Sequence, residues 1–384
     1  MLRFLTAGES HGQGLVAIIE GIPAGLSLAA EQINRDLGRR QLGFGRGARM
    51  KIENDEARIL SGVRHGLTIG SPISLLIVNR DWENWSVKMA VAPVAEAVET
   101  ARSPRPGHAD LTGALKTGQR DIRNILERAS ARETAARVAV GAVAKTLLSE
   151  IGITIVSHVV QIGSVKAGKA RPDADAAGKI DSSPVRCIDA EASVAMVEEI
   201  KKAAASKDTV GGIFEVIIYG CPPGLGSYSQ WDRRLNANLC RALASIPAVK
   251  GVEIGDGFDL GRRFGSESHD EIAHESGSGY FRATNRAGGI EGGMSNGEPI
   301  ILRAAMKPIP TLGAGLKTVD IVTKEPATAL SERSDICALP AAAVIGEAMA
   351  GLELAAAALE KFGGDSLLEF KRNVDGYLEQ IKGS

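Results

Sequence analysis

Two histidines and an aspartate lie in short segments that also carry glycine, proline or arginine. His11 lies in Gly8-Glu9-Ser10-His11-Gly12, His108 in Arg105-Pro106-Gly107-His108-Ala109-Asp110, and Asp335 in Arg333-Ser334-Asp335-Ile336-Cys337. Histidine changes protonation near neutral pH, and a carboxylate can accept a proton. Proline stiffens a loop, whereas glycine lets another molecule approach the backbone. The loops are candidate acid–base sites, although either histidine could also be an exposed residue in a tight turn.

Arginines accompany these loops and favour an anionic ligand. Guanidinium groups bind carboxylate and phosphate in a bidentate manner. Residues 39–50 hold four arginines among glycines, and Ser130 with Glu133 has the spacing of a helix-capping box, which predicts a helix over residues 130–150. A helix start beside arginines attracts anions. A solvated basic turn and a simple cap remain the alternatives. The candidate ligand-binding residues are Ser10, Ser130, Arg40, Arg46, Arg105, Arg132 and Arg333.

A glycine cluster is the other candidate for ligand contact. Residues 288–297 contain five glycines and lead into the apolar run of residues 299–302. Such a segment before a strand can cradle a planar or anionic ligand, although a flexible surface loop fits it as well. Residues 307–311 place a lysine and a threonine around two prolines. Together these groups suit a small polyanion that carries phosphate and carboxylates.

The hydrophobic pattern indicates which elements position these loops. It predicts strands at residues 4–7, 73–78, 153–162, 212–220 and 298–306, and a hairpin over residues 51–61. Helices are predicted at residues 29–41, 92–100, 192–206, 229–246, 338–359 and 367–381. Residues 167–190 and 261–287 read as variable or mobile loops of a single domain spanning residues 1–384.

Composition excludes several classes of protein. The net charge of −1 and 4% aromatic residues give no reason to expect nucleic acid or an anionic membrane. The apolar segment 338–359 contains Glu347 and Glu353, so we expect a buried helix instead of a membrane span. No metal site is expected, because His269 and His274 lack a third ligand. The N-terminus lacks the apolar run of a signal peptide and the cysteines form no CxxC pair, which favours a cytoplasmic protein.

The motifs, taken in order, resemble the chorismate synthase family over nearly the whole chain. They are the three loops above, Arg128-Ala129-Ser130-Ala131-Arg132-Glu133-Thr134-Ala135, and the glycine cluster. The resemblance implies the last step of the shikimate pathway, an anti 1,4-elimination of phosphate from 5-enolpyruvylshikimate 3-phosphate that requires reduced FMN. It also implies an α+β fold, a β-α-β sandwich in which antiparallel sheets enclose central helices, and a homotetramer.

The resemblance further implies roles for individual residues. His11 would protonate the leaving phosphate, His108 would protonate the reduced flavin near N1, and Asp335 would act through flavin N5 in proton removal. FMN contacts would come from Arg128, Ala129, Ser130, Ala248, Gly292, Lys307, Pro308, Ile309, Pro310, Thr311 and Arg333. The substrate, or NADPH as a possible reductant, would contact Ser10, Arg40, Arg46, Arg105 and Arg132.

The chain departs from the family pattern at two positions. Pro247 replaces the usual Asn before Ala248, which puts one flavin contact in doubt, and Thr117 stands where Tyr is common.

The sequence leaves two other functions open. A flavin-dependent oxidoreductase acting on a small polyanion is the main alternative, and a non-catalytic polyanion- or RNA-binding protein is the other. The sequence carries no added reductase domain, so an external flavin reductase is expected to supply the reduced cofactor.

Overall fold

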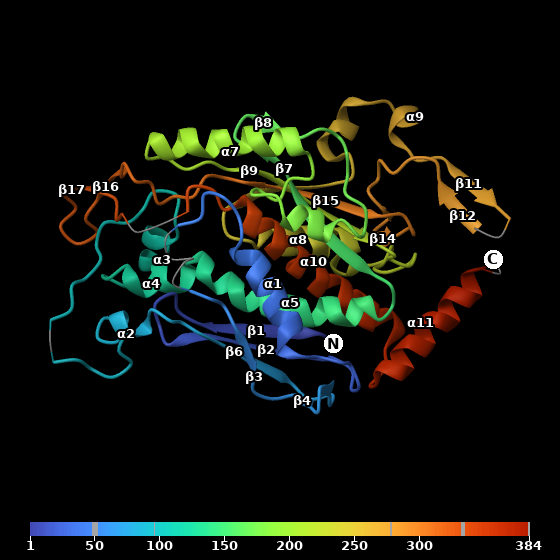
Figure 1. Cartoon of the computed structure of the whole chain (residues 1–384), viewed down its shortest axis with the longest axis horizontal. Helices are drawn as coiled ribbons and strands as arrows, with labels where there is room; N and C mark the ends of the chain where they lie inside the picture. Colours follow the sequence, from blue (N-terminus) through green and yellow to red (C-terminus); the bar gives the residue numbers. More distant parts are fainter. Residues whose placement is uncertain (48–52, 96, 277–278, 332–334, 383–384) are drawn as a thin grey trace.

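Helices lie between two antiparallel sheets in the computed structural model, which describes residues 1–47, 53–95, 97–276, 279–331 and 335–382 (Figure 1). The first sheet has the order β1-β2-β6-β3 and the second has the order β10-β15-β9-β7-β8. The first sheet is formed by β1 Arg3–Gly8, β2 Gly14–Glu20, β3 Ala57–Ile59 and β6 Ile73–Val78. The second is formed by β7 Thr154–Ile162, β8 Val165–Lys166, β9 Gly212–Tyr219, β10 Val249–Ile254 and β15 Ile300–Met306.

The layer between the sheets consists of α1 (Ala30–Gln41), α5 (Thr134–Ser149), α8 (Leu235–Ala244) and α10 (Leu339–Phe362). Helix α5 packs on β2 and β6 of the first sheet, and α10 packs on β7 and β9 of the second. Small residues let the two helices approach closely: a Cβ added to Gly141 would lie 2.3 Å from the Ala348 Cβ. The predicted α+β sandwich with central helices is therefore confirmed.

Shorter elements surround these layers. The helices are α2 Trp82–Trp85, α3 Asp110–Thr117, α4 Arg123–Ala129, α6 Ala177–Asp181, α7 Ala190–Ala205, α9 Gly265–Ser268 and α11 Leu367–Lys382. The hairpin strands are β4 Val63–Arg64, β5 Leu67–Thr68, β11 Ile272–Glu275, β12 Gly279–Arg282, β13 Ile290–Glu291, β14 Met294–Ser295, β16 Lys317–Val319 and β17 Pro326–Thr328.

A buried ionic cluster joins the central helices to the second sheet. Glu347, in the middle of α10, has no exposed surface. Its carboxylate accepts hydrogen bonds from Arg39 at 2.7 and 2.8 Å, from Lys145 at 2.7 Å and from Ser157 at 2.7 Å. Burial alone would raise the pKa of Glu347, but Lys145, Arg39 and Arg186 outweigh it and hold that pKa well below its usual range. The cluster fixes α1, and hence the neighbouring Arg40, against α10.

Among the described residues, α10 is the one helix whose length and apolar composition would allow it to cross a membrane, and 78% of its apolar window is buried inside the protein. The paired carboxylate of Glu347 also belongs to this helix. The prediction that residues 338–359 form a buried core helix is therefore confirmed.

Four local predictions were wrong. Residues 92–95 and 97–100 form no helix. Residues 53–61 form no hairpin with one another, because β3 pairs with β6. The helix expected from residue 130 begins at Thr134, after a 3₁₀ turn over Ala131–Glu133 in which the Ser130 hydroxyl accepts from the Arg132 N–H. The segment 261–287 is not a structureless connection, since it contains α9 and the β11–β12 hairpin.

Candidate active site

A cavity of about 700 Å³ lies where the loop after β1, the end of α1, the start of α5 and the start of α10 meet. Most of the residues that the sequence singled out line it, although they come from segments spread over more than 300 positions of the chain. They are Ser10, His11, Arg40, Arg46, Arg105, His108, Ala129, Ser130, Arg132, Ala248, Lys307, Ile309, Pro310, Thr311 and Asp335.

His11 is oriented by a carboxylate that the sequence did not reveal. Its Nδ1 lies 2.9 and 3.0 Å from the two carboxylate oxygens of Glu127, and its backbone N–H donates to the same group at 2.8 Å. Glu127 is 1% exposed. Burial alone would raise the pKa of Glu127, but the hydrogen bonds from His11 and the charge of Arg123 outweigh it and lower that pKa. Because Nδ1 faces Glu127, His11 would exchange a proton with a ligand through Nε2.

His108 repeats the same arrangement with a nearer carboxylate. Its Nδ1 lies 2.5 Å from Asp110 Oδ1, and Arg105 donates to the other oxygen of Asp110 at 2.8 Å. Asp110 is fully buried. Burial opposes its ionisation, yet hydrogen bonds from His108 and Arg105 hold the pKa of Asp110 well below its usual range. Both candidate histidines therefore have a buried carboxylate on Nδ1, which leaves Nε2 as the nitrogen that can face a ligand.

Two buried arginines form one wall of the cavity and share an acidic partner. Arg40 lies 3.3 Å from Asp55 and also donates to the Thr134 hydroxyl at 3.1 Å. Arg132 pairs with the other oxygen of Asp55 and donates to Asn79 at 2.9 and 3.0 Å. Burial, only partly offset by Asp55, lowers the pKa of Arg40 to about 10, so the guanidinium remains charged at neutral pH. Arg132 also pairs with the buried Glu53 at 3.5 Å, so the two guanidinium groups of this wall are held by two carboxylates.

Asp335 connects the basic loop to the start of α10. Its carboxylate pairs with Arg46 at 2.8 Å and accepts the Gly47 N–H at 2.7 Å. The backbone N–H of Ile336 donates to the Gly45 carbonyl at 2.7 Å. The predicted basic loop and the predicted aspartate loop are therefore one structural unit in the described part of the chain, which includes Arg46 and Gly47 but not residues 48–52.

Apolar side chains also line the cavity and offer contact area to an aromatic ring system. They belong to Ile246, Pro247, Ala248, Ile309, Pro310, Ala338, Ala341, Ala342 and Ile345. Ala248 has a φ of +68°, a conformation that costs a non-glycine residue about 1–3 kcal/mol and clusters at ligand sites. Its carbonyl accepts the Lys307 N–H at 3.0 Å. Pro247 contributes a ring surface and no N–H, so the contact expected from the usual Asn is absent here.

Residues 307–311 are tied to the His108 loop by polar contacts. The Lys307 ammonium donates to the Gly107 carbonyl at 2.8 Å, and Arg105 donates to the Thr311 hydroxyl at 2.9 Å. Burial and the charge of Lys250 lower the pKa of Lys307. These bonds hold the Lys307 ammonium and the proline-containing segment 308–310 against the loop that carries His108.

Three of the predicted contacts that the structure describes are not at the cavity wall, and a fourth lies outside the described residues. Arg128 donates to the Thr6 and Gly8 carbonyls at 2.9 and 3.2 Å, so its guanidinium anchors β1. Gly292 lies in the turn between β13 and β14, and Pro308 also is not among the lining residues in the described chain. Arg333 lies outside the described residues. The glycine cluster around Gly292 forms this tight turn, in which a Cβ on Gly293 would lie 2.6 Å from the Ser227 carbonyl oxygen.

Sequence reasoning missed the groups that orient the histidines. Glu127 immediately precedes a predicted contact residue, but nothing in the sequence connects it to His11, 116 positions away. Asp110 was within the quoted motif, and its position two residues after His108 was the available signal. Trp85 and Asp81 also line the cavity. They come from a segment for which no role was predicted.

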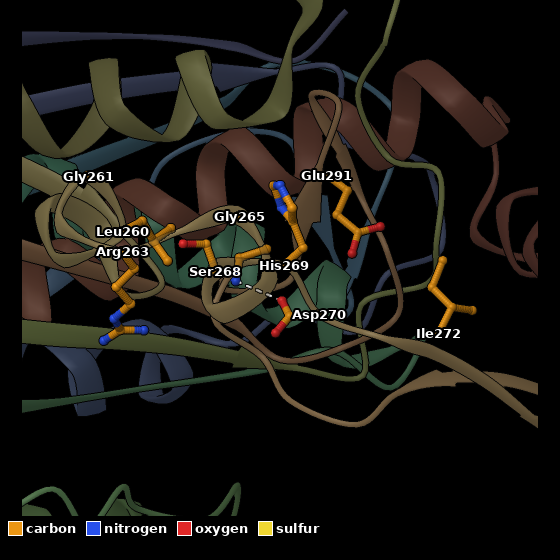
Figure 2. A pocket seen from close by; sticks show the side chains of 10 residues that line it. Leu260, Gly261, Arg263, Gly265, Ser268, His269, Asp270, Ile272 and Glu291 are labelled. Carbon is orange, nitrogen blue, oxygen red and sulfur yellow. Dashed lines mark hydrogen bonds between the residues drawn. The ribbon is translucent and has the colours of Figure 1, made fainter.

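A second depression of about 660 Å³ lies between α9 and the glycine cluster (Figure 2). Its charged groups serve the local fold: Asp270 accepts the backbone N–H groups of Arg286 and Ala287 at 2.8 and 2.9 Å, and Arg263 pairs with Asp256 at 2.7 Å. Glu291 pairs with Arg282 at 2.7 Å. Among the residues the structure describes, no cluster of His, Cys, Asp and Glu could hold a metal ion, here or elsewhere.

The fold and the first cavity define an α+β protein with paired acid–base groups in an arginine-lined pocket that suits a small anion. The family described as chorismate synthase matches residues 2–359. Chorismate synthase of Desulforudis audaxviator is 58% identical over 384 residues, covering 100% of this chain and 98% of the relative. That of Moorella thermoacetica is 57% identical over 382 residues, with full coverage of both.

A solved structure described as a crystal structure of chorismate synthase superposes with a TM-score of 0.82 at 45% identity and covers 100% of this chain and 99% of the other. The chain therefore belongs to the chorismate synthase family. It is an enzyme of the carbon–oxygen lyase class that serves aromatic amino acid biosynthesis, as the resemblance of its motifs predicted.

Proposed function

We propose that this enzyme catalyses the anti 1,4-elimination of phosphate from 5-enolpyruvylshikimate 3-phosphate to give chorismate, with reduced FMN as cofactor. The observation that carries the proposal is that a single cavity holds His11, His108 and Asp335 beside several arginines. In this reaction the bond between C3 and the phosphate oxygen breaks, hydrogen leaves C6, and a new double bond completes the conjugated diene. The reaction is redox-neutral overall.

The substrate carries one phosphate and two carboxylates, which suits the arginine-lined wall. Arg40, Arg46 and Arg105 would bind these groups, while Arg132, bonded to Asp55 and Asn79, would support the wall from behind. Preorganised cations in a cavity that excludes water stabilise charge on a leaving phosphate much more strongly than they would in water. Ser10, 2% exposed and within the same wall, would bind at the same end as His11.

The residues present fit a bound FMN. The apolar lining residues from Ile246 to Ala248 and from Ile309 to Pro310 would contact the ring system, and Lys307, Thr311 and Ser130 offer polar groups in the same cavity. The strained backbone of Ala248 is an independent sign of a ligand contact. When bound, reduced FMN would supply electron density to the breaking carbon–oxygen bond. For Arg128, Pro308 and Gly292 the single chain gives no support for the predicted cofactor contact.

The chain's own acid–base groups would act at different atoms of the reacting molecules. His11, held by Glu127, would donate the proton on Nε2 to the leaving phosphate. His108, held by Asp110, would keep a proton at the wall that would hold the cofactor. Asp335, ion-paired with Arg46 at 2.8 Å, would accept the proton that leaves C6. Its hydrogen bond to Gly47 joins the described end of the basic loop to the same site.

We also propose the cellular setting that the family resemblance implied. The enzyme would be a cytoplasmic homotetramer, bind no nucleic acid or membrane, and receive its reduced FMN from an external flavin reductase. NADPH would be at most the ultimate reductant. Size-exclusion chromatography with light scattering tests the tetramer, and an NADPH-only turnover assay tests whether a separate reductase is required.

Anaerobic turnover with photoreduced FMN tests the reaction itself. We expect chorismate and phosphate to form in equal amounts, with no net oxidation of the flavin. If folded protein makes no chorismate under these conditions, the proposal is rejected. Stoichiometric consumption of NADPH together with a reduced second product would instead identify a flavin-dependent oxidoreductase.

A further inference from the structure

Trp85 covers the ring of His11 and is itself held in place. The indole and imidazole rings stack with centroids 3.9 Å apart and planes inclined by 26°. Trp85 ends the short helix α2, and its indole N–H donates to Asp81 at 3.1 Å, one turn earlier. The other oxygen of Asp81 accepts from Asn84 at 2.7 Å. Both Trp85 and Asp81 line the cavity.

The segment that carries Trp85 is joined to the loop that carries His11. The Asn79 side chain, 2% exposed, donates to the Glu9 and Gly12 carbonyls at 3.0 and 2.8 Å. The Asn79 backbone N–H donates to the Gln13 carbonyl at 3.1 Å. These bonds bracket His11, so the indole and the imidazole are presented from two loops that cannot move independently.

Trp85 has no evident role in packing the interior. It belongs to none of the hydrophobic core clusters formed by the described residues, and it is partly exposed. A large aromatic side chain is ordinarily retained in a protein for the apolar area it buries. Here the ring contact is to His11, and charged groups surround it: the Arg123 guanidinium lies 5.2 Å and the Lys88 ammonium 5.6 Å from the indole centroid.

His11 is thus constrained in two directions. Glu127 fixes the edge of the imidazole through Nδ1, and Trp85 fixes its face. Arg123 belongs to both contacts, because it donates to Glu127 at 3.0 Å and lies over the indole.

We infer that Trp85 is a positioning residue for proton donation by His11, and that Asp81 sets the orientation of its indole. The inference rests on the proposed function, in which His11 donates the proton to the leaving phosphate. Trp85 would not contact the reacting atoms. Its effect would come from keeping Nε2 aimed at one point, since a displacement of about 1 Å at a catalytic group can cost on the order of 100-fold in rate.

Steady-state kinetics with reduced FMN test the positioning role. We expect Trp85→Ala to lower kcat about 10- to 100-fold while KM changes less than about threefold, because substrate binding is assigned to the arginines. Trp85→Phe keeps an aromatic face and should recover most of kcat. Trp82→Phe, on the same helix but not at the cavity wall, is the matched control and should match the wild type. Equal kcat for Trp85→Ala and wild type would overturn the inference.

Fluorescence tests the stack without any activity. A variant with Trp82 and Trp231 replaced by Phe retains Trp85 as its one indole, since the chain has three tryptophans. A protonated imidazole in contact with an indole quenches its emission, so we expect emission to fall as the pH is lowered through the range in which histidine gains its proton, about pH 8 to 5. Adding His11→Asn should abolish this step. A step that survives His11→Asn would refute the stacked pair.

The two assays separate failure of this inference from failure of the proposed reaction. If the wild type makes no chorismate, the proposed function fails while the fluorescence step still reports whether Trp85 and His11 are stacked. If the wild type is active and the step is present, but Trp85→Ala turns over normally, the positioning role alone is wrong.

Discussion

Replacing Glu127 with glutamine tests whether a carboxylate on Nδ1 makes His11 a proton donor. The change keeps the shape of the side chain but removes a charge that contacts His11 at three points, between 2.8 and 3.0 Å, and Arg123 at 3.0 Å. Only one side-chain oxygen remains to accept hydrogen bonds from His11 and Arg123. The new amide N–H groups of glutamine face at least one of these donors and cannot accept from it. The imidazolium form of His11 loses the negative charge that stabilises it, whereas the neutral ring does not depend on that charge.

The size of the effect follows from the bond that is lost. A hydrogen bond to a charged group contributes about 1.5–3 kcal/mol. If that amount is lost from the protonated state that donates to the phosphate, kcat falls about 10- to 150-fold at neutral pH. The loss should shrink as the pH is lowered, because a higher proton concentration restores the imidazolium. KM should change little, since the predicted substrate contacts are the arginines.

Stopped-flow measurement of chorismate formation under anaerobic conditions between pH 6 and 8 provides the assay. Glu353→Gln is a matched control: it makes the same chemical change at a glutamate of α10 paired with Arg241 at 3.1 Å, and Glu353 is not at the cavity wall. Thermal unfolding of both variants checks that the fold is retained. If Glu127→Gln turned over within twofold of the wild type across this range, the orienting role of the carboxylate would be refuted.

Three further outcomes are expected. Glu347→Leu leaves Arg39 and Lys145 without their buried partner and should cost about 3–5 kcal/mol of unfolding free energy, measured by urea denaturation; an unchanged midpoint would contradict the assigned network. Ala248→Val puts a β-branched residue at a φ of +68° and should destabilise by about 1–3 kcal/mol, whereas Ala248→Gly should leave the melting temperature nearly unchanged. The pKa values of Glu347, Asp110 and Glu127 are lowered in the folded protein, so in acid the unfolded chain binds more protons than the folded one. The free energy of unfolding should therefore be constant above about pH 5 and fall progressively as acid is added below it. An acid titration followed by circular dichroism would contradict this if stability rose below pH 5.

The sequence by itself determined the central framework and the chemical types in the site. Residues 338–359 could be predicted as a buried helix because a continuous alanine-rich pattern leaves no polar face, and the observed α10 spans Leu339–Phe362. The strand at residues 73–78 followed from an apolar run of strand length, and the strand at residues 212–220 from alternating apolar positions. His11 and His108 could be singled out because glycine, and for His108 also proline, lies beside them, and Asp335 because it accompanies an arginine just before a predicted helix.

Local pattern failed where a neighbour from a distant segment decided the outcome. Residues 57–61 have the composition of a hairpin strand, but β3 pairs with β6 because that strand presents the hydrogen-bonding edge of the first sheet. The cap predicted at Ser130 exists, yet it closes a 3₁₀ turn whose arginine is drawn toward Asp55 and Asn79. Neither partner is close to Ser130 in the sequence.

Only the tertiary structure decided which charges meet. Glu127 reaches His11 across 116 positions, Glu347 reaches Arg39 across 308, and Asp335 reaches Gly47 across 288. A carboxylate carries the same sequence signal whether it is solvated or buried, because its partner is set by the packing of helices and sheets and not by its neighbours along the chain. For the same reason the indole of Trp85 gave no sign in the sequence that it would lie against an imidazole.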